Sequence, residues 1–395
     1  MKRLQSPNVR SLNKVVSGLL AVFVLLAGCG SSIRPLPAAR HTQTNWVVRD
    51  SEAFEAIAFL NALTGDPLAR PHYLADLRHF EPLITAEVKD ALATLADFRD
   101  HTLHAHLSGF MMAFFLAGKA KTLDDLIALT AGPESIRQAL KDYDRSLVEI
   151  NIYYGDQGWK MFEETLPSLQ TVFSFLREAG FADYWRAGHL DQIRQECARI
   201  QSAVRDRNIV PIIEAHLGFG LPSDQVTIYL VHYLWPYGHH LIGTSLATVP
   251  EDSDSGVVRT TVHELLHNPF NNTDPAFWEA ANSLKEDPFL SEAFGARDPK
   301  YGYNNWPDYV AEDSVRALEQ RIEEGLGLGP RWNWTEDGGM HVLARVLYAL
   351  MEKQGFPQNG ESYQDFIRRT VAEGTLAPGR AESLCCGGTR GRGPQ

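Results

Sequence analysis

Cysteine is scarce in this sequence. Only Cys29, Cys197, Cys385 and Cys386 occur in a chain of 395 residues. The last two are adjacent, and neighbouring cysteines can form a disulfide only with strain. No CxxC pair is present either. We therefore expect neither a disulfide framework nor a cysteine-ligated zinc site.

Basic residues are outnumbered by acidic ones. The chain has 37 Lys and Arg against 49 Asp and Glu, which gives a formal net charge of −12. Proteins that bind nucleic acid neutralise phosphates with clustered Lys and Arg side chains. The balance of charge thus argues against nucleic acid as a partner.

Long hydrophobic runs are missing outside the N-terminus. The run VVSGLLAVFVLLAG, residues 15–28, follows the basic stretch MKRLQSPNVR and is too short for a comfortable membrane span. The run leads into LAGC, which resembles a bacterial lipobox, the signal in which cysteine is lipidated and becomes the first mature residue. An ordinary signal peptide with an accidental cysteine, or a short anchor helix, is the alternative.

The lipobox resemblance implies a location as well as a modification. It implies a signal peptide over residues 1–28 and attachment to a membrane through lipidated Cys29, in the bacterial cell envelope. Gly30, rather than an aspartate, follows the cysteine. This favours the periplasmic face of the outer membrane as the site of attachment.

The rest of the chain divides by composition and periodicity. Residues 29–48 are rich in Ser and Pro and are predicted to be a linker. Helical patterns then dominate, as in SEAFEAIAFLNALTG, where Ser51 suits a helix N-cap and Gly65 suits a stop. The predicted segments are a helical domain over 49–217, a second domain over 218–380 and a disordered tail over 381–395.

The second domain opens with a change of pattern. The segment DQVTIYLVHYLW, residues 224–235, alternates and is rich in β-branched and aromatic residues, so it predicts a strand. PYGHH is then predicted to be a turn that exposes His239 and His240, before a returning strand over 241–249. Helices follow near 274–285, 307–325, 338–354 and 360–373. We therefore expect an α+β, predominantly α-helical fold.

A short motif, HELLH, carries most of the functional information. His263 and His267 are four residues apart, so on a helix both imidazoles lie on one face and can bind one metal ion. Glu264 lies beside that face, where it can reach a metal-bound water without being a ligand. Asp254 or Ser255 can cap the helix. The alternative is a chance pairing on an ordinary packed helix.

With this motif the sequence resembles the zincin metallopeptidases over roughly residues 220–325. The resemblance implies Zn²⁺ as cofactor, a peptide or protein as substrate, and an edge strand that pairs with the substrate backbone. Either of the two predicted strands could fill that place. Pro269 departs from the zincin pattern and should end the helix early, because proline lacks an amide donor.

The third metal ligand is less clear from the sequence. The metzincin pattern would need Gly at 270 and His at 273, but the chain has Phe270 and Thr273. A glutamate, as in gluzincins, fits better. Glu312 is favoured because it flanks the apolar stripe of a helix that starts at Pro307; alternatively, it lies on a solvated face and pairs with Arg316. The candidates are Glu279, Glu286, Glu292 and Glu312.

These parts predict a zinc-dependent peptidase in which Glu264 is the general base. Candidates for stabilising the oxyanion are, by residue type, Tyr301, Tyr303, Tyr309 and His341. Two other functions remain open. One is a catalytically inactive zincin-like lipoprotein that binds zinc, peptide or an envelope partner. The other is a structural lipoprotein in which HELLH is incidental.

Overall fold

The computed structural model describes most of the chain after the N-terminal segment. Residues 34–395 group into one compact unit. The predicted signal peptide and Cys29 lie outside the described residues. The described residues are 40–103, 106–118, 120–143, 156–267, 274–298, 303, 305–329, 333–357 and 360–386.

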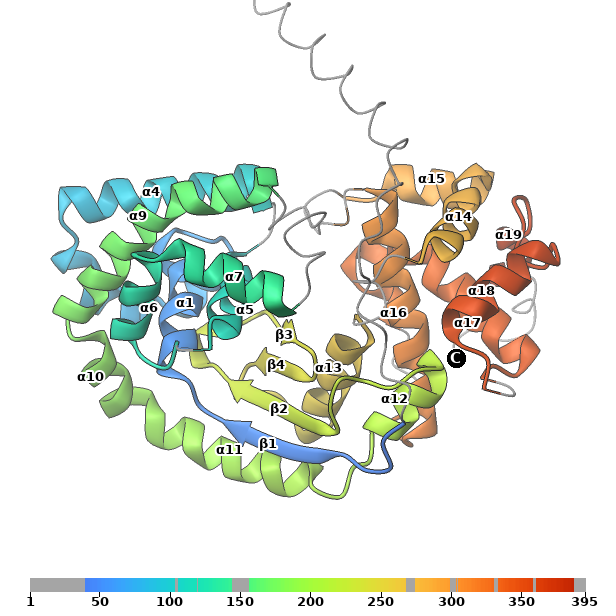
Figure 1. Cartoon of the computed structure of the whole chain (residues 1–395), viewed down its shortest axis with the longest axis horizontal. Coiled ribbons are helices and arrows are strands. Elements are labelled where there is room, and N and C mark those ends of the chain that lie inside the picture. Colours follow the sequence, from blue (N-terminus) through green and yellow to red (C-terminus); the bar gives the residue numbers. More distant parts are fainter. Residues whose placement is uncertain are drawn as a thin grey trace, which may run out of the picture. The chain divides into compact units, whose positions relative to one another are not determined.

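The fold is α+β and predominantly helical, which confirms the expectation from the sequence (Figure 1). A single mixed sheet of four strands lies among the helices, in the order β1-β2-β4-β3. β1 and β2 are parallel, β2 and β4 are parallel, and β3 is antiparallel to β4. The strands are β1 (Asn45–Arg49), β2 (Gln225–Leu230), β3 (His239–Ile242) and β4 (Ser245–Thr248).

The described residues between β1 and β2 are mostly helical. Many of these helices are short, and α9 is the longest of those described. They are α1 (Glu52–Leu63), α2 (Ala69–His72), α3 (Leu74–Phe80), α4 (Ala86–Phe98), α5 (Phe110–Leu116), α6 (Leu123–Thr130), α7 (Pro133–Tyr143), α9 (Asp156–Glu178), α10 (Phe181–Trp185), α11 (Asp191–Val204) and α12 (Val210–Leu217).

Helices also follow the sheet. The chain leaves β4 directly into α13, which carries the HELLH motif. The helices after β4 are α13 (Asp254–Leu266), α14 (Pro275–Ser283), α15 (Pro288–Ala296), α16 (Trp306–Gly325), α17 (Val342–Gln354), α18 (Tyr363–Ala372) and α19 (Ala381–Cys386).

Local signals set several helix ends as expected. The Ser51 side chain accepts a hydrogen bond from the amide of Phe54 and so caps α1. Gly65, just past the end of α1, has a φ of +82°, in the left-handed region that glycine adopts at little cost. Pro307 lies in the first turn of α16, where its missing amide does no harm.

The strand pairing corrects the predicted hairpin. β2 does not pair with the next strand in sequence but lies parallel to β4, with Thr227 opposite Ser245. The antiparallel pair is β3 and β4, joined by a tight turn in which Gly243 has a φ of +58°. His239 and His240, which were predicted to be exposed turn residues, are part of β3 and are half-buried.

Three segments are more ordered than the sequence indicated. β1 forms within the predicted linker, because Trp46 is buried and its strand pairs with β2. α15 lies between two predicted helices, in residues where no helix was predicted. The predicted disordered tail begins with α19, in which Ala381 and Cys385 are buried. Burial against distant parts of the chain outweighs the local composition in each case. The boundary predicted at residues 217/218 stays a prediction.

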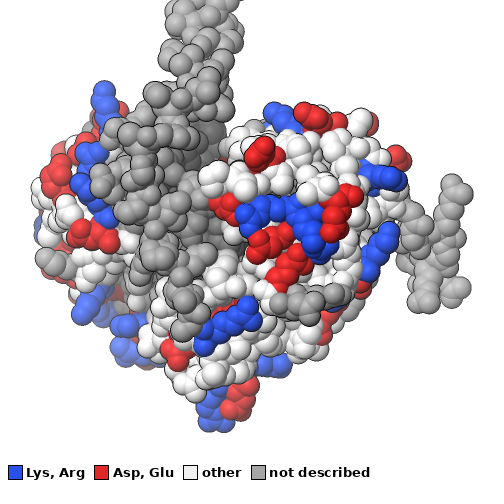
Figure 2. All heavy atoms as spheres, turned by 45° about the vertical axis from the view of Figure 1, so that its right-hand side comes forward, with Lys and Arg blue, Asp and Glu red and all other residues white. Residues whose placement is uncertain are grey.

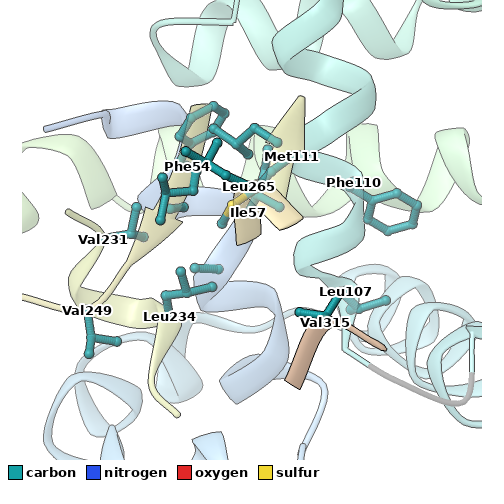
Figure 3. Close-up of a cluster of buried hydrophobic side chains, with 14 of the residues drawn as sticks. Phe54, Ile57, Leu107, Phe110, Met111, Val231, Leu234, Val249, Leu265 and Val315 are labelled. Carbon is teal, nitrogen blue, oxygen red and sulfur yellow. The ribbon is translucent and has the colours of Figure 1, made fainter. Parts of the chain in front are cut away.

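The core runs between the N-terminal helices and the motif helix. Figure 3 shows Ile57 of α1, Met111 of α5, Leu265 of α13 and Val315 of α16 in one hydrophobic cluster. All four side chains are fully buried. The position of α13 therefore depends on packing against elements from both halves of the chain.

Charged side chains of both signs are interspersed on the face drawn in Figure 2. Opposite charges also pair: Arg369 of α18 forms ion pairs with Glu361 and Glu373. Among the described residues, no helix is both long enough and apolar enough to span a membrane.

Candidate metal centre

The HELLH motif occupies the last turn of α13. The helix is capped by Ser253, whose side chain accepts a hydrogen bond from the amide of Gly256. The cap thus lies one residue before the predicted Asp254. Valine and leucine side chains on one face of α13 are buried in the core, and this fixes the direction of the opposite, histidine-bearing face.

α13 ends early, as the sequence predicted. Its last residue is Leu266, and His267 follows as the C-cap with φ of −68° and ψ of −18°, which still lies in the helical region. Pro269 itself lies outside the described residues. Because His267 keeps helical backbone angles, the one-turn spacing between the two imidazoles is preserved.

The two histidine side chains converge on one point. The Nε2 atoms of His263 and His267 lie 3.3 Å apart. Both rings are half-buried. Two imidazoles with their Nε2 atoms turned toward each other at this distance leave a place for a shared cation.

Glu312 completes the group from α16, which packs beside α13. Its Oε1 lies 3.8 Å from Nε2 of His263, and its Oε2 lies 3.7 Å from Nε2 of His267. The side chain is almost fully buried. The other candidate glutamates are all exposed: Glu279, Glu286 and Glu292. Of the four, only Glu312 therefore lies beside the histidines.

The spacing of these atoms fits a tetrahedral metal ion. Ligand atoms bonded to zinc at about 2.0–2.1 Å in a tetrahedron are separated by about 3.3 Å. In the structure the two Nε2 atoms lie 3.3 Å apart, Oε1 of Glu312 lies 3.8 Å from Nε2 of His263, and Oε2 of Glu312 lies 3.7 Å from Nε2 of His267. His263, His267 and Glu312 thus form a group that could hold a metal ion. Two nitrogens and one carboxylate are the donor set of many catalytic zinc sites.

A second layer of side chains orients His263. Nδ1 of His263 lies 3.2 Å from Oε2 of Glu319, which also accepts a hydrogen bond of 2.8 Å from Asn333. If Nδ1 carries the proton, it donates to Glu319, and the lone pair of Nε2 then points at the metal position. Carboxylates that hold a ligand histidine in this way fix its tautomer and raise its affinity for metal.

Arg316 holds the carboxylate of Glu312. Its Nε donates to Oε1 of Glu312 at 2.8 Å, while its two terminal nitrogens donate to Glu336 and Asp337. Arg316 is 8% exposed, so the pair is buried and not on a solvated helix face. A bond to Oε1 leaves Oε2 of Glu312 free to turn toward a metal ion.

The electrostatics show that the group attracts a cation. Burial alone would lower the pKa of His263, but the carboxylates of Glu312 and Glu319 outweigh burial and raise it to about 9. Burial and the neighbouring His263 lower the pKa of His267 to about 3. Burial would raise the pKa of Glu312, but Arg316 and the histidines lower it to about 2. Without metal, one proton on His263 supplies the positive charge that a divalent ion would replace.

Glu264 lies on the side of α13 that faces β3. Its side chain is buried, and burial raises its pKa to about 7. The backbone amide of His240 in β3 favours the charged form of the same carboxylate and partly offsets the effect of burial on its pKa. A carboxyl group with a pKa near neutrality can accept and return a proton at physiological pH.

Among the predicted oxyanion-stabilising residues, two are enclosed in the core. The hydroxyl of Tyr309 donates to the carbonyl of Met340, and the side chain is fully buried. His341 is also fully buried, and both ring nitrogens bond carboxylates, those of Asp313 and Asp337. Neither side chain can contact a substrate in this conformation. The prediction that they could stabilise an oxyanion is therefore wrong for both residues.

Tyr303 remains beside the site. Its backbone has a φ of +53°, unusual for a residue with a side chain, and its ring is half-buried. Burial and the charge of Glu312 raise its pKa well above the usual value. Tyr303 therefore keeps its proton and can donate a hydrogen bond. Tyr301 lies outside the described residues.

A second group of possible metal ligands consists of Asp76, His189 and His232. Oδ1 of Asp76 already accepts hydrogen bonds from Tyr184 and Tyr233 and lies 3.0 Å from Nε2 of His189. The rings of His189 and His232 stack, with centroids 4.1 Å apart and planes tilted by 21°. Lone pairs in the planes of stacked rings run side by side and do not converge. This geometry fits a hydrogen-bond network better than a metal centre.

Several residues that contact the candidate metal centre or its ligands were not predicted from the sequence. Glu319 is seven residues after Glu312, so helical spacing could have placed both on one face of α16. Asn333 and the β3 segment approach the site from elsewhere in the chain, and no short-range pattern marks them. Comparison with known proteins adds no relative: no protein-family model, curated protein or solved structure matches this chain.

Proposed function

We propose that this protein is a zinc-dependent peptidase of the bacterial cell envelope. The single observation that carries the proposal is the convergence of His263, His267 and Glu312 beside the buried carboxylate of Glu264. Two neutral imidazoles and one carboxylate hold zinc and leave a fourth position open for water or substrate. The lipobox-like sequence at Cys29 supports the location.

The chain's own residues supply the remaining chemistry. A zinc ion bound here would acidify a water molecule and polarise a substrate carbonyl. Glu264, with a pKa near 7, accepts the proton from the attacking water and passes it to the leaving amine. Tyr303 keeps its phenolic proton and can donate it in a hydrogen bond to the oxygen on which negative charge develops.

The edge strand provides a place for the substrate backbone. β3 is one of the two edge strands of the described sheet, and Gly238 just before it lies close to Glu264. An extended peptide can add to such an edge through main-chain hydrogen bonds. A peptide held there would present its amide bonds to the region between α13 and the sheet, which supports a peptide or protein as substrate.

Substitution of Glu264 by Gln tests the proposal. The mature protein, Glu264→Gln and a control, Glu286→Gln, are loaded with zinc and incubated with a peptide library whose cleavage is followed by mass spectrometry. Glu286 is exposed and remote from the motif in sequence. We expect Glu264→Gln to keep its zinc and to cleave at least about 100-fold more slowly than the wild type, because the general base is lost.

Three outcomes are informative. Cleavage by Glu264→Gln at the wild-type rate would contradict the mechanism. Bound zinc without cleavage by the wild-type protein would favour a catalytically inactive zinc-binding lipoprotein. Absence of bound zinc in the wild-type protein would favour a structural role for the chain.

A further inference from the structure

Gly238 enters β3 against the face of α13 that carries Glu264. Its φ lies outside the left-handed region, so its backbone does not require glycine. The space around it, however, is tight. A Cβ atom at this position would lie 3.0 Å from Cγ2 of Thr260 and 3.3 Å from Oε1 of Glu264. Both separations are shorter than ordinary van der Waals contact between a Cβ atom and its neighbours.

The residues that follow Gly238 also influence Glu264. Two residues after Gly238, the backbone amide of His240 favours the charged form of the Glu264 carboxylate and so lowers its pKa against the effect of burial. Oε1 of Glu264 therefore lies close to the main chain at the start of β3, where Gly238 leaves room for it. Glu264 is only 9% exposed, so few other positions are open to its side chain.

We propose that Gly238 is a positioning residue for Glu264. The missing side chain at Gly238 lets the carboxylate rest on the main chain of β3, and this contact sets its place beside the metal ligands. The inference rests on the proposed function for its catalytic consequence, because a displaced general base transfers protons less efficiently. A shift of about 1 Å can lower a rate about 100-fold.

Enlarging residue 238 stepwise tests the proposal. The variants are Gly238→Ala and Gly238→Val, with Gly295→Ala as the control. Gly295 lies in α15, and a Cβ atom there would meet no atom within 4 Å. For the zinc-loaded protein and a peptide cleaved by the wild type, we expect kcat to fall about tenfold with Ala and further with Val. KM and zinc content should stay within about twofold, because the metal ligands do not move.

A double variant separates positioning from simple crowding. Thr260→Ser removes the Cγ2 atom that a Cβ at residue 238 would meet first. We expect Gly238→Ala/Thr260→Ser to recover the melting temperature of the wild type but not its kcat, because the contact with Glu264 remains. Recovery of kcat together with the melting temperature would overturn the proposal, as would an equal loss of kcat in Gly295→Ala.

Crystal structures of the wild type and Gly238→Val supply a readout that needs no activity. We expect the Glu264 carboxylate to lie beside the main chain of residue 238 in the wild type and to move away from it in the variant. An unmoved carboxylate would overturn the inference even if the protein cleaves peptides. Conversely, a wild type that binds no zinc would contradict the proposed function, while the two crystal structures would still decide where Gly238 places Glu264.

Discussion

Individual side chains at the candidate centre have different roles, and Glu319 is the clearest example. It does not contact the metal position but accepts a hydrogen bond from Nδ1 of His263. Its negative charge also favours a cation on the far side of that ring. We therefore expect the affinity of the centre for a metal ion to depend on a residue outside the three ligands.

Replacing Glu319 by Gln should weaken zinc binding. The variant keeps the shape of the side chain but loses the charge that makes His263 a stronger ligand, so we expect the Kd for zinc to rise about 10- to 100-fold. Competition with a chromogenic chelator measures the Kd. The exposed Glu292 provides the control variant Glu292→Gln. Equal affinities in the two variants would mean that Glu319 does not tune the centre.

Glu55 is a buried carboxyl group far from the motif in sequence. Its oxygens accept the amides of His232 and Tyr233, at 2.8 and 3.0 Å, and burial raises its pKa to about 7. A raised carboxyl pKa means that the folded state binds the proton more tightly than the unfolded chain does. The stability from this proton is fully present below about pH 4.5 and is lost as the pH rises through about 7.

Glu55→Gln should remove this dependence on pH. Relative to the variant, the wild type should lose about 2 kcal/mol of unfolding free energy between pH 5 and pH 8, which follows from the shift of its pKa. Urea unfolding at both pH values measures the difference, with exposed Glu87→Gln as the control. A constant difference between wild type and Glu55→Gln at the two pH values would contradict the raised pKa.

At the scale of elements, α13 connects the core to the metal ligands. Its N-terminus is capped by Ser253, whose side chain accepts a hydrogen bond of 3.0 Å from the amide of Gly256. We expect Ser253→Ala to lower the unfolding free energy by about 1 kcal/mol, because the amide loses its partner. Ser253→Asp should restore most of it, since aspartate also caps helices.

Chemical denaturation of the three proteins measures this effect, with Ser291→Ala in α15 as the control. Ser291 is exposed in α15. A loss in Ser253→Ala no larger than in Ser291→Ala would show that the cap contributes little. Zinc affinity should change less than stability in all of them, because the ligands lie at the other end of α13.

Elements whose signals act within one turn were predictable from the sequence. Ser51, Gly65 and Pro307 mark helix ends through contacts a few residues away, and the structure has those ends where they were expected. The one-turn spacing of His263 and His267 belongs to the same class. Strand pairing does not follow from such short-range signals. β2 pairs with β1 and β4, and only the folded chain decides which strands lie side by side.

The same distinction explains the mistaken view of β3. His239 and His240 follow Pro236 and Gly238, a composition typical of a turn. The tight turn instead forms at Gly243, and β3 continues past Glu264. Gly238 lies close against a helix that comes later in the sequence, and no local rule could have shown that contact.

At the scale of the whole molecule, the candidate centre is supported from both halves of the chain. The core behind α13 includes Ile57 and Met111 from the N-terminal half as well as Val315 of α16 (Figure 3). A metal ion held by His263, His267 and Glu312 would link α13 to α16. Because the ligands come from two packed helices, binding should stabilise the folded state by mass action.

Zinc content is the most direct measurement of the central claim. The mature protein, His263→Ala and a control variant, His101→Ala, are equilibrated with zinc, freed of unbound metal and analysed by mass spectrometry for metal per chain. His101 is exposed and lies far from the motif in sequence. We expect about one zinc ion per chain in the wild type and in His101→Ala, and almost none in His263→Ala. A wild type without stoichiometric zinc, or a His263→Ala variant that binds as much, would contradict the account.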